Sequence, residues 1–227
     1  MKWGELKYLI YADLYRCYGR ANPYLVLREL LWGVAGKFII WMRVAAFLAT
    51  RSRWWLPLYL FARLMHRRYT IRYGINIAYQ ATIGPGLSIA HFGGINVNQH
   101  VRIGRNCNLS QGVTIGISNR GGSKGVPVIG DNVYIGPGAK LFGAIRVGDN
   151  VAVGANCVVV EDVPDNAVVF GVPARIIGYA GSAGYVNRTD YAAHFPHPAK
   201  PEPVEDPAAE PLERAGPSDD DGERLAG

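Results

Sequence analysis

The stretch VIGDNVYIGPGAKLFGAIRVGDNVAVGANCVVV, residues 128–160, decides the fold. An aliphatic residue recurs in it every six positions, and a second small or aliphatic residue follows four positions after most of these leads. The leads are Ile129, Ile135, Leu141, Val147, Val153 and Val159. A period of six fits neither the 3.6-residue turn of an α-helix nor a single long alternating strand. It predicts a parallel β-solenoid, in which each repeat forms one edge of a stacked coil.

The same period extends toward the N-terminus as far as residue 71. One run of leads comprises Ile71, Ile77, Ile83 and Ile89, and another comprises Val97, Ile103, Leu109 and Ile115. Glycine commonly follows the lead residue, and its conformational freedom permits the corner between two edges. We therefore predict a mainly β domain over 71–178, with about five coils of three hexapeptides each.

The period slips at two places. Ile89 and Val97 are eight residues apart instead of six, and Ile115 and Ile129 are fourteen apart instead of twelve. Insertions in a solenoid bulge outward and mark the face that carries function. The two slips therefore predict one working face, with His91 in the first slip and a basic loop carrying Arg120 and Lys124 in the second.

His91 is the candidate general base, because an imidazole can accept a proton near neutral pH. The alternative is a corner residue without a catalytic role. Its position at a frame break, beside Gly93 and Gly94, favours catalysis. No residue pairs with His91 at a metal-ligand spacing, so no metal site is expected.

Residues 1–70 are dense in apolar residues and poor in Gly and Pro, which predicts helices. Two interpretations stay open: an oligomerisation unit, or a basic, Trp-rich helical pair lying on a cytoplasmic membrane surface. A membrane-spanning helix over residues 30–49 is disfavoured, because Lys37 and Arg43 interrupt the apolar run. The N-terminal residues lack the pattern of a secretory signal, so we expect a cytoplasmic protein, either free or peripheral at the inner face of the cytoplasmic membrane.

Charge is divided along the chain. The net charge of +6 combines +12 over residues 1–199 with −6 over residues 200–227. Residues 30–130 hold twelve basic residues and no carboxylate, which favours anionic partners such as nucleotide phosphates or anionic lipid. Nucleic acid is not expected, because no reading module is recognisable. A C-terminal extension over 179–198 precedes an acidic tail, 199–227, that we predict to be disordered.

With the closing GVPARI at 171–176, residues 70–180 resemble the serine acetyltransferase branch of the hexapeptide-repeat acyltransferases. The motifs that carry the resemblance are GINI, IAHFGG, VTIG, VIGDNVYIGPGAK, VGANCVV and GVPARI. The resemblance implies a left-handed parallel β-helix that forms a homotrimer or a dimer of trimers, with acetyl-CoA as co-substrate. By this resemblance His91 takes the proton from an acceptor hydroxyl, whose oxygen attacks the thioester without an acyl-enzyme intermediate.

The resemblance also implies a CoA-binding wall. The backbone around five residues matches the place of the pantetheine arm: Gly116, Ser118, Pro137, Ala139 and Ala155. Arg175 matches the position near the charged end of CoA, with Lys140 as a helper, because a guanidinium pairs well with phosphate.

Two positions depart from the serine-specific pattern. Serine-specific members carry an aspartate fifteen residues before the histidine, where this chain has Asn76, and an amide stabilises imidazolium less than a carboxylate does. They also carry Arg-His before the proline of the loop, where this chain has Gly125-Val126-Pro127. Both departures favour the branch associated with capsule and exopolysaccharide synthesis, so the predicted acceptor is a sugar hydroxyl. The alternatives are serine O-acetylation and a non-catalytic scaffold.

Overall fold

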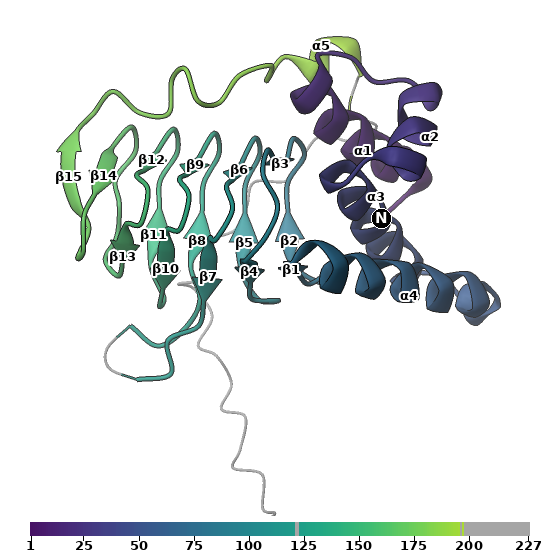
Figure 1. Ribbon diagram of the computed structural model, residues 1–227, viewed down its shortest axis with the longest axis horizontal. Coiled ribbons are helices and arrows are strands. Elements are labelled where there is room, and N and C mark those ends of the chain that lie inside the picture. Colours follow the sequence, from purple (N-terminus) through teal and green to yellow (C-terminus); the bar gives the residue numbers. More distant parts are fainter. Residues whose placement is uncertain (121–122, 196, 198–227) are drawn as a thin grey trace, which may run out of the picture.

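The computed structural model describes residues 1–120, 123–195 and 197, and it consists of a helical region followed by a stack of β-coils (Figure 1). The predicted acidic tail, 199–227, lies outside the described residues.

Three sheets run along the stack, and each of the first four coils contributes one short strand to each sheet. The β1 sheet contains β1 (Ile75–Ile77), β4 (Ile95–Val97), β7 (Thr114–Gly116), β10 (Lys140–Phe142) and β13 (Val158–Val159). The β2 sheet contains β2 (Thr82–Ile83), β5 (Arg102–Ile103), β8 (Val128–Ile129) and β11 (Arg146–Val147). The β3 sheet contains β3 (Ser88–Ile89), β6 (Asn108–Leu109), β9 (Tyr134–Ile135), β12 (Ala152–Val153), β14 (Val168–Phe170) and β15 (Arg175–Gly178).

The six-residue leads stack on one another inside the solenoid. All strand pairs are parallel except the closing pair of β14 and β15, and the register places Ile83 beside Ile103 and Ile103 beside Ile129. These side chains are almost completely buried, so the six-residue period of the sequence marks the positions that point into the core. The prediction of a parallel solenoid of about five coils is confirmed.

The predicted start of the solenoid shifts by one hexapeptide. Helix α4 (Leu56–Tyr73) continues through Ile71, whose side chain is 73% exposed, and the first strand begins at Ile75. Ile71 is therefore a helical surface residue and not the first lead of the solenoid.

The other helices cover the N-terminal end of the stack. They are α1 (Trp3–Tyr18), α2 (Pro23–Trp32) and α3 (Ala35–Ala49), while the short 3-10 helix η1 (Arg53–Trp55) directly precedes α4. Phe38, Ile39 and Met42 of α3 belong to the same buried cluster as the solenoid leads. Helix α3 therefore closes the apolar interior that the first coil would otherwise expose.

A buried ion pair fixes these helices to the first coil. Arg43 donates to Asp13 through Nε at 3.0 Å and to the backbone carbonyls of Ile83 and Gly84 at 2.6 and 2.7 Å. Asp13 in turn accepts the backbone N–H groups of Gly86 and Leu87, each at 2.8 Å. Within the described residues no single helix is long and apolar enough to cross a membrane, and the bent pair α2 and α3, at 109°, passes by length and composition only.

The segment after β15 runs back along the stack to the helices (Figure 1). Ser182 donates to the carbonyl of Asn132 at 2.5 Å, and Tyr185 stacks on Tyr134. The short helix α5 (Tyr191–His194) then packs against α1, where Tyr191 contacts Tyr8 edge-on. Within the predicted extension, 179–198, the described residues up to Phe195 thus connect the two ends of the solenoid.

Candidate active site

His91 lies at the corner where the chain passes from the β3 sheet to the β1 sheet. Its side chain is exposed, and within the described residues it makes no hydrogen bond or ion pair. Gly93 and Gly94 adopt φ values of +107° and +66°, which L-residues rarely take. This conformation accommodates the two extra residues between Ile89 and Val97. The bulge therefore holds the imidazole outside the stacked wall, where a substrate can reach it.

The corner that carries His91 continues along the stack as one edge. Backbone hydrogen bonds connect its successive turns: Gly112 to Gly93, Gly138 to Gln111, and Asn156 to Pro137, at 2.8, 2.9 and 2.8 Å. Because adjacent strands lie about 4.8 Å apart, the turns of Pro137 and Ala155 lie roughly 10 and 14 Å along this edge from the turn of His91. The structure thus brings three of the predicted site residues, His91, Pro137 and Ala155, onto a single edge.

A column of polar side chains runs along the outer face of the adjoining β1 sheet. The register aligns Asn76 with Asn96, Asn96 with Thr114, and Thr114 with Lys140. The amide nitrogen of Asn76 donates to the oxygen of Asn96 at 3.3 Å. The hydrogen bond of Asn76 therefore goes along the column to the next coil and not to His91.

Lys140 supports the edge that carries His91. Its ammonium group donates to the carbonyl of Gly112 at 2.6 Å and to the hydroxyl of Thr114 at 3.0 Å. Lys140 therefore fastens the β1 sheet to the turn directly beside Gly93, and its predicted contact with the charged end of CoA stays a prediction.

The second frame break borders the opposite edge of the β1 sheet. Gly116 ends β7, and a loop then leaves the stack (Figure 1), with Ser118 and Gly125 exchanging backbone hydrogen bonds at 2.9 and 3.0 Å. Arg120 and Lys124 are exposed on this loop, while residues 121–122 lie outside the described residues. The two insertions therefore flank one face, the outer face of the β1 sheet, as the frame breaks predict.

Ala139 differs from the other predicted wall residues. Its side chain is fully buried in the core, its N–H donates to Gly136 at 3.2 Å, and its carbonyl accepts from Thr114 at 2.9 Å. Ala155, in contrast, is exposed in its turn. Ala139 therefore shapes the coil, and its role at a ligand stays a prediction.

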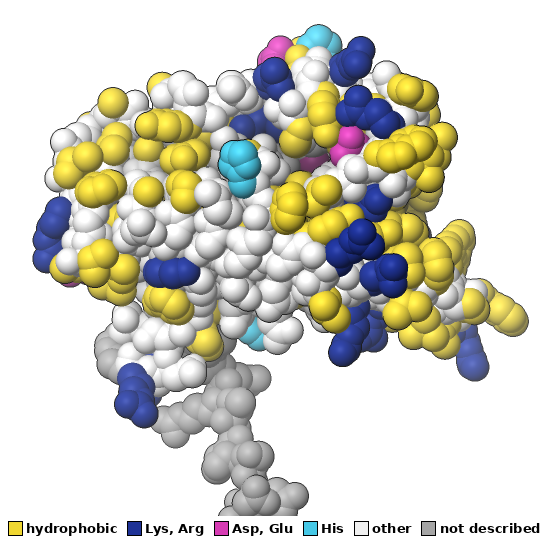
Figure 2. Space-filling view, in the orientation of Figure 1, with side chains coloured by type: hydrophobic (Ala, Val, Ile, Leu, Met, Phe, Trp, Pro, Cys, Tyr) yellow, Lys and Arg dark blue, Asp and Glu magenta, His cyan; other side chains and the backbone are white. Residues whose placement is uncertain are grey.

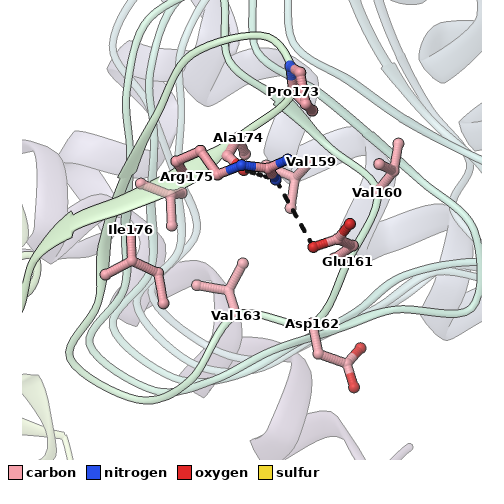
Figure 3. A pocket seen from close by; sticks show the side chains of 10 residues that line it. Val159, Val160, Glu161, Asp162, Val163, Pro173, Ala174, Arg175 and Ile176 are labelled. Atoms are coloured by element: carbon pink, nitrogen blue, oxygen red, sulfur yellow. Dashed lines mark hydrogen bonds and ion pairs between the residues drawn. The ribbon is translucent and has the colours of Figure 1, made fainter.

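Arg175 borders a cavity of about 220 Å³ at the C-terminal end of the stack (Figure 3). Val159, Glu161 and Ala174 also line it. The guanidinium of Arg175 donates to the carbonyl of Ala174 at 2.9 Å and lies 3.9 Å from the carboxylate of Glu161. Both charged side chains are largely exposed, so this ion pair is weak and leaves the guanidinium accessible to an anionic group.

The sequence did not predict the cluster of three aromatic side chains beside His91. We call this cluster, Tyr69, Tyr73 and Phe92, the aromatic ledge. Tyr69 and Tyr73 stack with ring centroids 5.5 Å apart, and Tyr73 contacts Phe92 at 5.8 Å. Phe92 follows His91 directly in the chain and is 53% exposed. The available signal was an aromatic residue inside the first frame break, but its partner Tyr73 lies on α4, whose end could not be placed from the pattern.

The site thus consists of an exposed imidazole, an open edge and a polar sheet face. Within the described part of the chain no three His, Cys, Asp or Glu side chains form a group that could hold a metal ion. An exposed imidazole of this kind can accept a proton near neutral pH. The class that fold and site define is a transferase built on a hexapeptide solenoid.

Comparison with known proteins agrees with this class. A family model described as bacterial transferase hexapeptide (six repeats) matches residues 127–161. A serine acetyltransferase of Staphylococcus xylosus is 34% identical over 176 residues, which cover 78% of this chain and 76% of the relative. A serine acetyltransferase of Mycobacterium tuberculosis is 36% identical over 148 residues, which cover 65% of this chain but only 59% of that relative's length.

Solved structures match over about three quarters of the chain. Serine acetyltransferase from Brucella abortus strain S19 in complex with coenzyme A has a TM-score of 0.64 at 30% identity, covering 78% of this chain and 69% of that chain. Neisseria gonorrhoeae serine acetyltransferase in complex with serine has a TM-score of 0.62 at 32% identity, covering 76% and 69%. The chain belongs to the hexapeptide-repeat acyltransferase family, and its relatives are serine acetyltransferases. These relatives do not support the predicted closeness to the capsule and exopolysaccharide branch.

Proposed function

We propose that this enzyme is an O-acetyltransferase that transfers the acetyl group of acetyl-CoA to the hydroxyl of L-serine. The observation that carries the proposal is the position of His91, exposed on an edge that it shares with Pro137 and Ala155, in a chain of which 78% is similar to a serine acetyltransferase. The names of relatives reported with coenzyme A and with serine support the two substrates. This acceptor replaces the sugar hydroxyl predicted from the sequence as the first choice.

In the proposed reaction His91 removes the proton from the acceptor hydroxyl. The hydroxyl oxygen forms a bond to the thioester carbonyl carbon, the carbon–sulfur bond breaks, and CoA leaves as the thiolate. The proton held by His91 is then available to the thiolate, so the imidazole returns to its neutral form. No side chain is acylated, which agrees with a site built around a base and not around a nucleophile.

The edge of the solenoid gives CoA a path. We expect the pantetheine arm to follow the turns of Pro137 and Ala155, and the phosphates to approach Arg175 at the C-terminal end. We also expect a homotrimer, as the resemblance implies, in which a neighbouring solenoid borders the exposed edge. Light scattering should give a mass of about 74 kDa, three times the 24.8 kDa of one chain.

One assay tests the acceptor and the base together. Purified enzyme is mixed with acetyl-CoA and either L-serine or a panel of sugars, and release of the CoA thiol is recorded. We expect turnover with L-serine, and we expect His91→Ala to lower kcat by about 10²- to 10⁴-fold, the usual contribution of a general base. His100→Ala, which removes another exposed histidine, is the matched control. Full turnover by His91→Ala would contradict the mechanism.

A sugar hydroxyl is the second candidate acceptor, and the aromatic ledge favours it. The apolar C–H face of a sugar ring packs well on aromatic side chains, and Phe92 offers such a surface next to His91. If a sugar is the acceptor, Phe92→Ala should raise KM for that sugar at least several-fold. If L-serine is the acceptor, the same variant should leave the KM for L-serine nearly unchanged.

A further inference from the structure

Helix α4 has two apolar faces, and only one of them is packed. Ala62 and His66 are buried on the inner face, where His66 contacts the ring of Phe38 on α3. On the opposite face Leu60, Leu64 and Ile71 are 52%, 59% and 73% exposed. Their spacing of four and seven residues places them in one stripe along the helix. The outer stripe therefore has no partner within the described residues.

Two exposed tryptophans lie in η1, directly before the N-terminal end of the helix. Because α4 ends at Tyr73, next to the first strand, its N-terminal end and η1 lie farthest from the coils. Figure 1 shows α4 projecting beyond the stack, roughly in line with it. Trp54 is 88% exposed and Trp55 is 48% exposed. We call η1 and the outer stripe together the α4 face, which comprises Arg53, Trp54, Trp55, Leu60, Leu64, Arg67, Arg68 and Ile71.

The charge around the α4 face is entirely positive. Exposed Arg67 and Arg68 flank the stripe on its two sides, and Arg53 lies beside the tryptophans. Figure 2 shows Lys and Arg side chains among hydrophobic ones over this helix, whereas Asp and Glu side chains gather near the other helices. The sequence from residue 30 to residue 130 contains no carboxylate at all.

The positive charge distinguishes between two possible partners of the α4 face, a second copy of the protein and a lipid bilayer. A second copy of α4 would bring arginine against arginine with no carboxylate between them, which disfavours self-association through this face. An anionic bilayer offers phosphate groups to the arginines, an interfacial region to the tryptophans and acyl chains to the leucines. Both parts of the α4 face therefore match one partner.

We propose that the α4 face docks peripherally on an anionic phospholipid bilayer. The helix lies on the surface, with Trp54 and Trp55 at the headgroup level and Arg67 and Arg68 against lipid phosphates. Since acetyl-CoA is a cytoplasmic substrate, the surface is the inner face of the cytoplasmic membrane. Membrane docking does not depend on which acceptor the enzyme uses. The vesicle experiment can therefore fail without affecting the proposed function, and the reverse also holds.

The test is sedimentation of the full-length protein with vesicles of phosphatidylcholine alone or mixed with phosphatidylglycerol. We expect binding to the mixed vesicles to exceed binding to the neutral vesicles at least tenfold and to weaken with added salt. Arg67→Gln should lower the partition coefficient about fivefold, which corresponds to about 1 kcal/mol per arginine at an anionic surface, and Arg68→Gln should do the same. The double variant Trp54→Ala/Trp55→Ala should lower partition to both kinds of vesicle.

Tyr179→Ala is the matched control, because Tyr179 is 64% exposed at the other end of the solenoid. Thermal unfolding and thiol-release activity should be the same in all variants, which separates docking from folding and catalysis. Equal binding to neutral and anionic vesicles would overturn the proposal. So would a tryptophan double variant that binds vesicles like the unchanged protein but sediments at a lower oligomeric mass, since the α4 face would then join protein copies.

Discussion

Asn76 shows how far residue-level reasoning reaches without a structure. Its position fifteen residues before His91 made it the expected partner of the imidazole. In the structure its amide instead hydrogen-bonds Asn96 on the next coil. Residue spacing therefore identified Asn76 as a candidate but not the partner of its amide, because that partner lies on a neighbouring coil twenty residues away.

Asn76→Asp should raise kcat/KM with L-serine, by about tenfold or about 1.4 kcal/mol of transition-state stabilisation. A carboxylate on this strand adds negative charge near the developing imidazolium, whereas the amide adds none. Thiol release measures the effect. Asn96→Asp introduces the same charge one coil along and should have a smaller effect. Equal effects of the two variants would mean that only the net charge of the face matters.

The sequence located the bulge that carries His91 but not the aromatic ledge beside it, for one physical reason. A break in a six-residue period can be read from the chain alone, because the period reflects local stacking. The contact of Phe92 with Tyr73 instead requires knowledge of where α4 ends and how it enters the first coil. That junction is a tertiary feature with no period of its own.

At the scale of elements, α4 illustrates how a local pattern can mislead. Ile71 fits the six-residue period because it lies six residues before Ile77, yet it belongs to a helix. The outer and inner apolar faces of α4 also obscure its helical periodicity, since apolar residues occur on both sides. Packing against α3, and not the pattern, decides which of the two faces is buried.

The packed face of α4 contains a histidine that should make stability depend on pH. Burial lowers the pKa of His66, while its hydrogen bond to the carbonyl of Ile77, at 3.1 Å, opposes the shift. The unfolded chain therefore binds a proton more readily, near its ordinary pKa of about 6.5. The contribution of neutral His66 is present above that pH, and stability is lost as the pH falls through the lowered pKa.

We expect the free energy of unfolding in urea to fall between pH 7.5 and pH 5.5, and His66→Phe to flatten this dependence. Phenylalanine retains the contact with the ring of Phe38 without a titrating group. His100→Gln, at an exposed corner, should leave the slope unchanged. An unchanged slope in His66→Phe would assign the pH dependence to other groups.

The ion pair between α1 and α3 should be the most sensitive contact of the helical region. Asp13→Asn leaves the Arg43 guanidinium buried without its charged partner, so we expect a loss of about 3–5 kcal/mol in the free energy of unfolding. Glu161→Gln breaks an exposed ion pair and should cost less than about 1 kcal/mol. Urea denaturation of the two variants measures both values, and similar losses would contradict the structural importance of the buried pair.

At the scale of the whole molecule, the helices are part of the solenoid's stability. The sequence predicted a helical region but left its role open between oligomerisation and membrane contact. The structure adds a role that the period could not reveal: α3 contributes Phe38, Ile39 and Met42 to the solenoid core. A solenoid exposes its apolar interior at each end, so an end cap is a physical necessity of the repeat.

Deletion of residues 1–52 should therefore unfold the first coil. Without α1 and α3, Ile75, Ile83 and Leu87 lose the cover of the cap, and the backbone groups of Gly84, Gly86 and Leu87 lose their partners on Asp13 and Arg43. We expect the truncated chain to aggregate, or to show faster amide hydrogen exchange in β1–β3 than in β8–β12. A truncated chain that stays soluble, with the exchange rates of the full-length protein in β1–β3, would show that the helices are an appendage. The α4 face, for which we propose docking on a bilayer, is retained in this variant, so the experiment tests the cap alone.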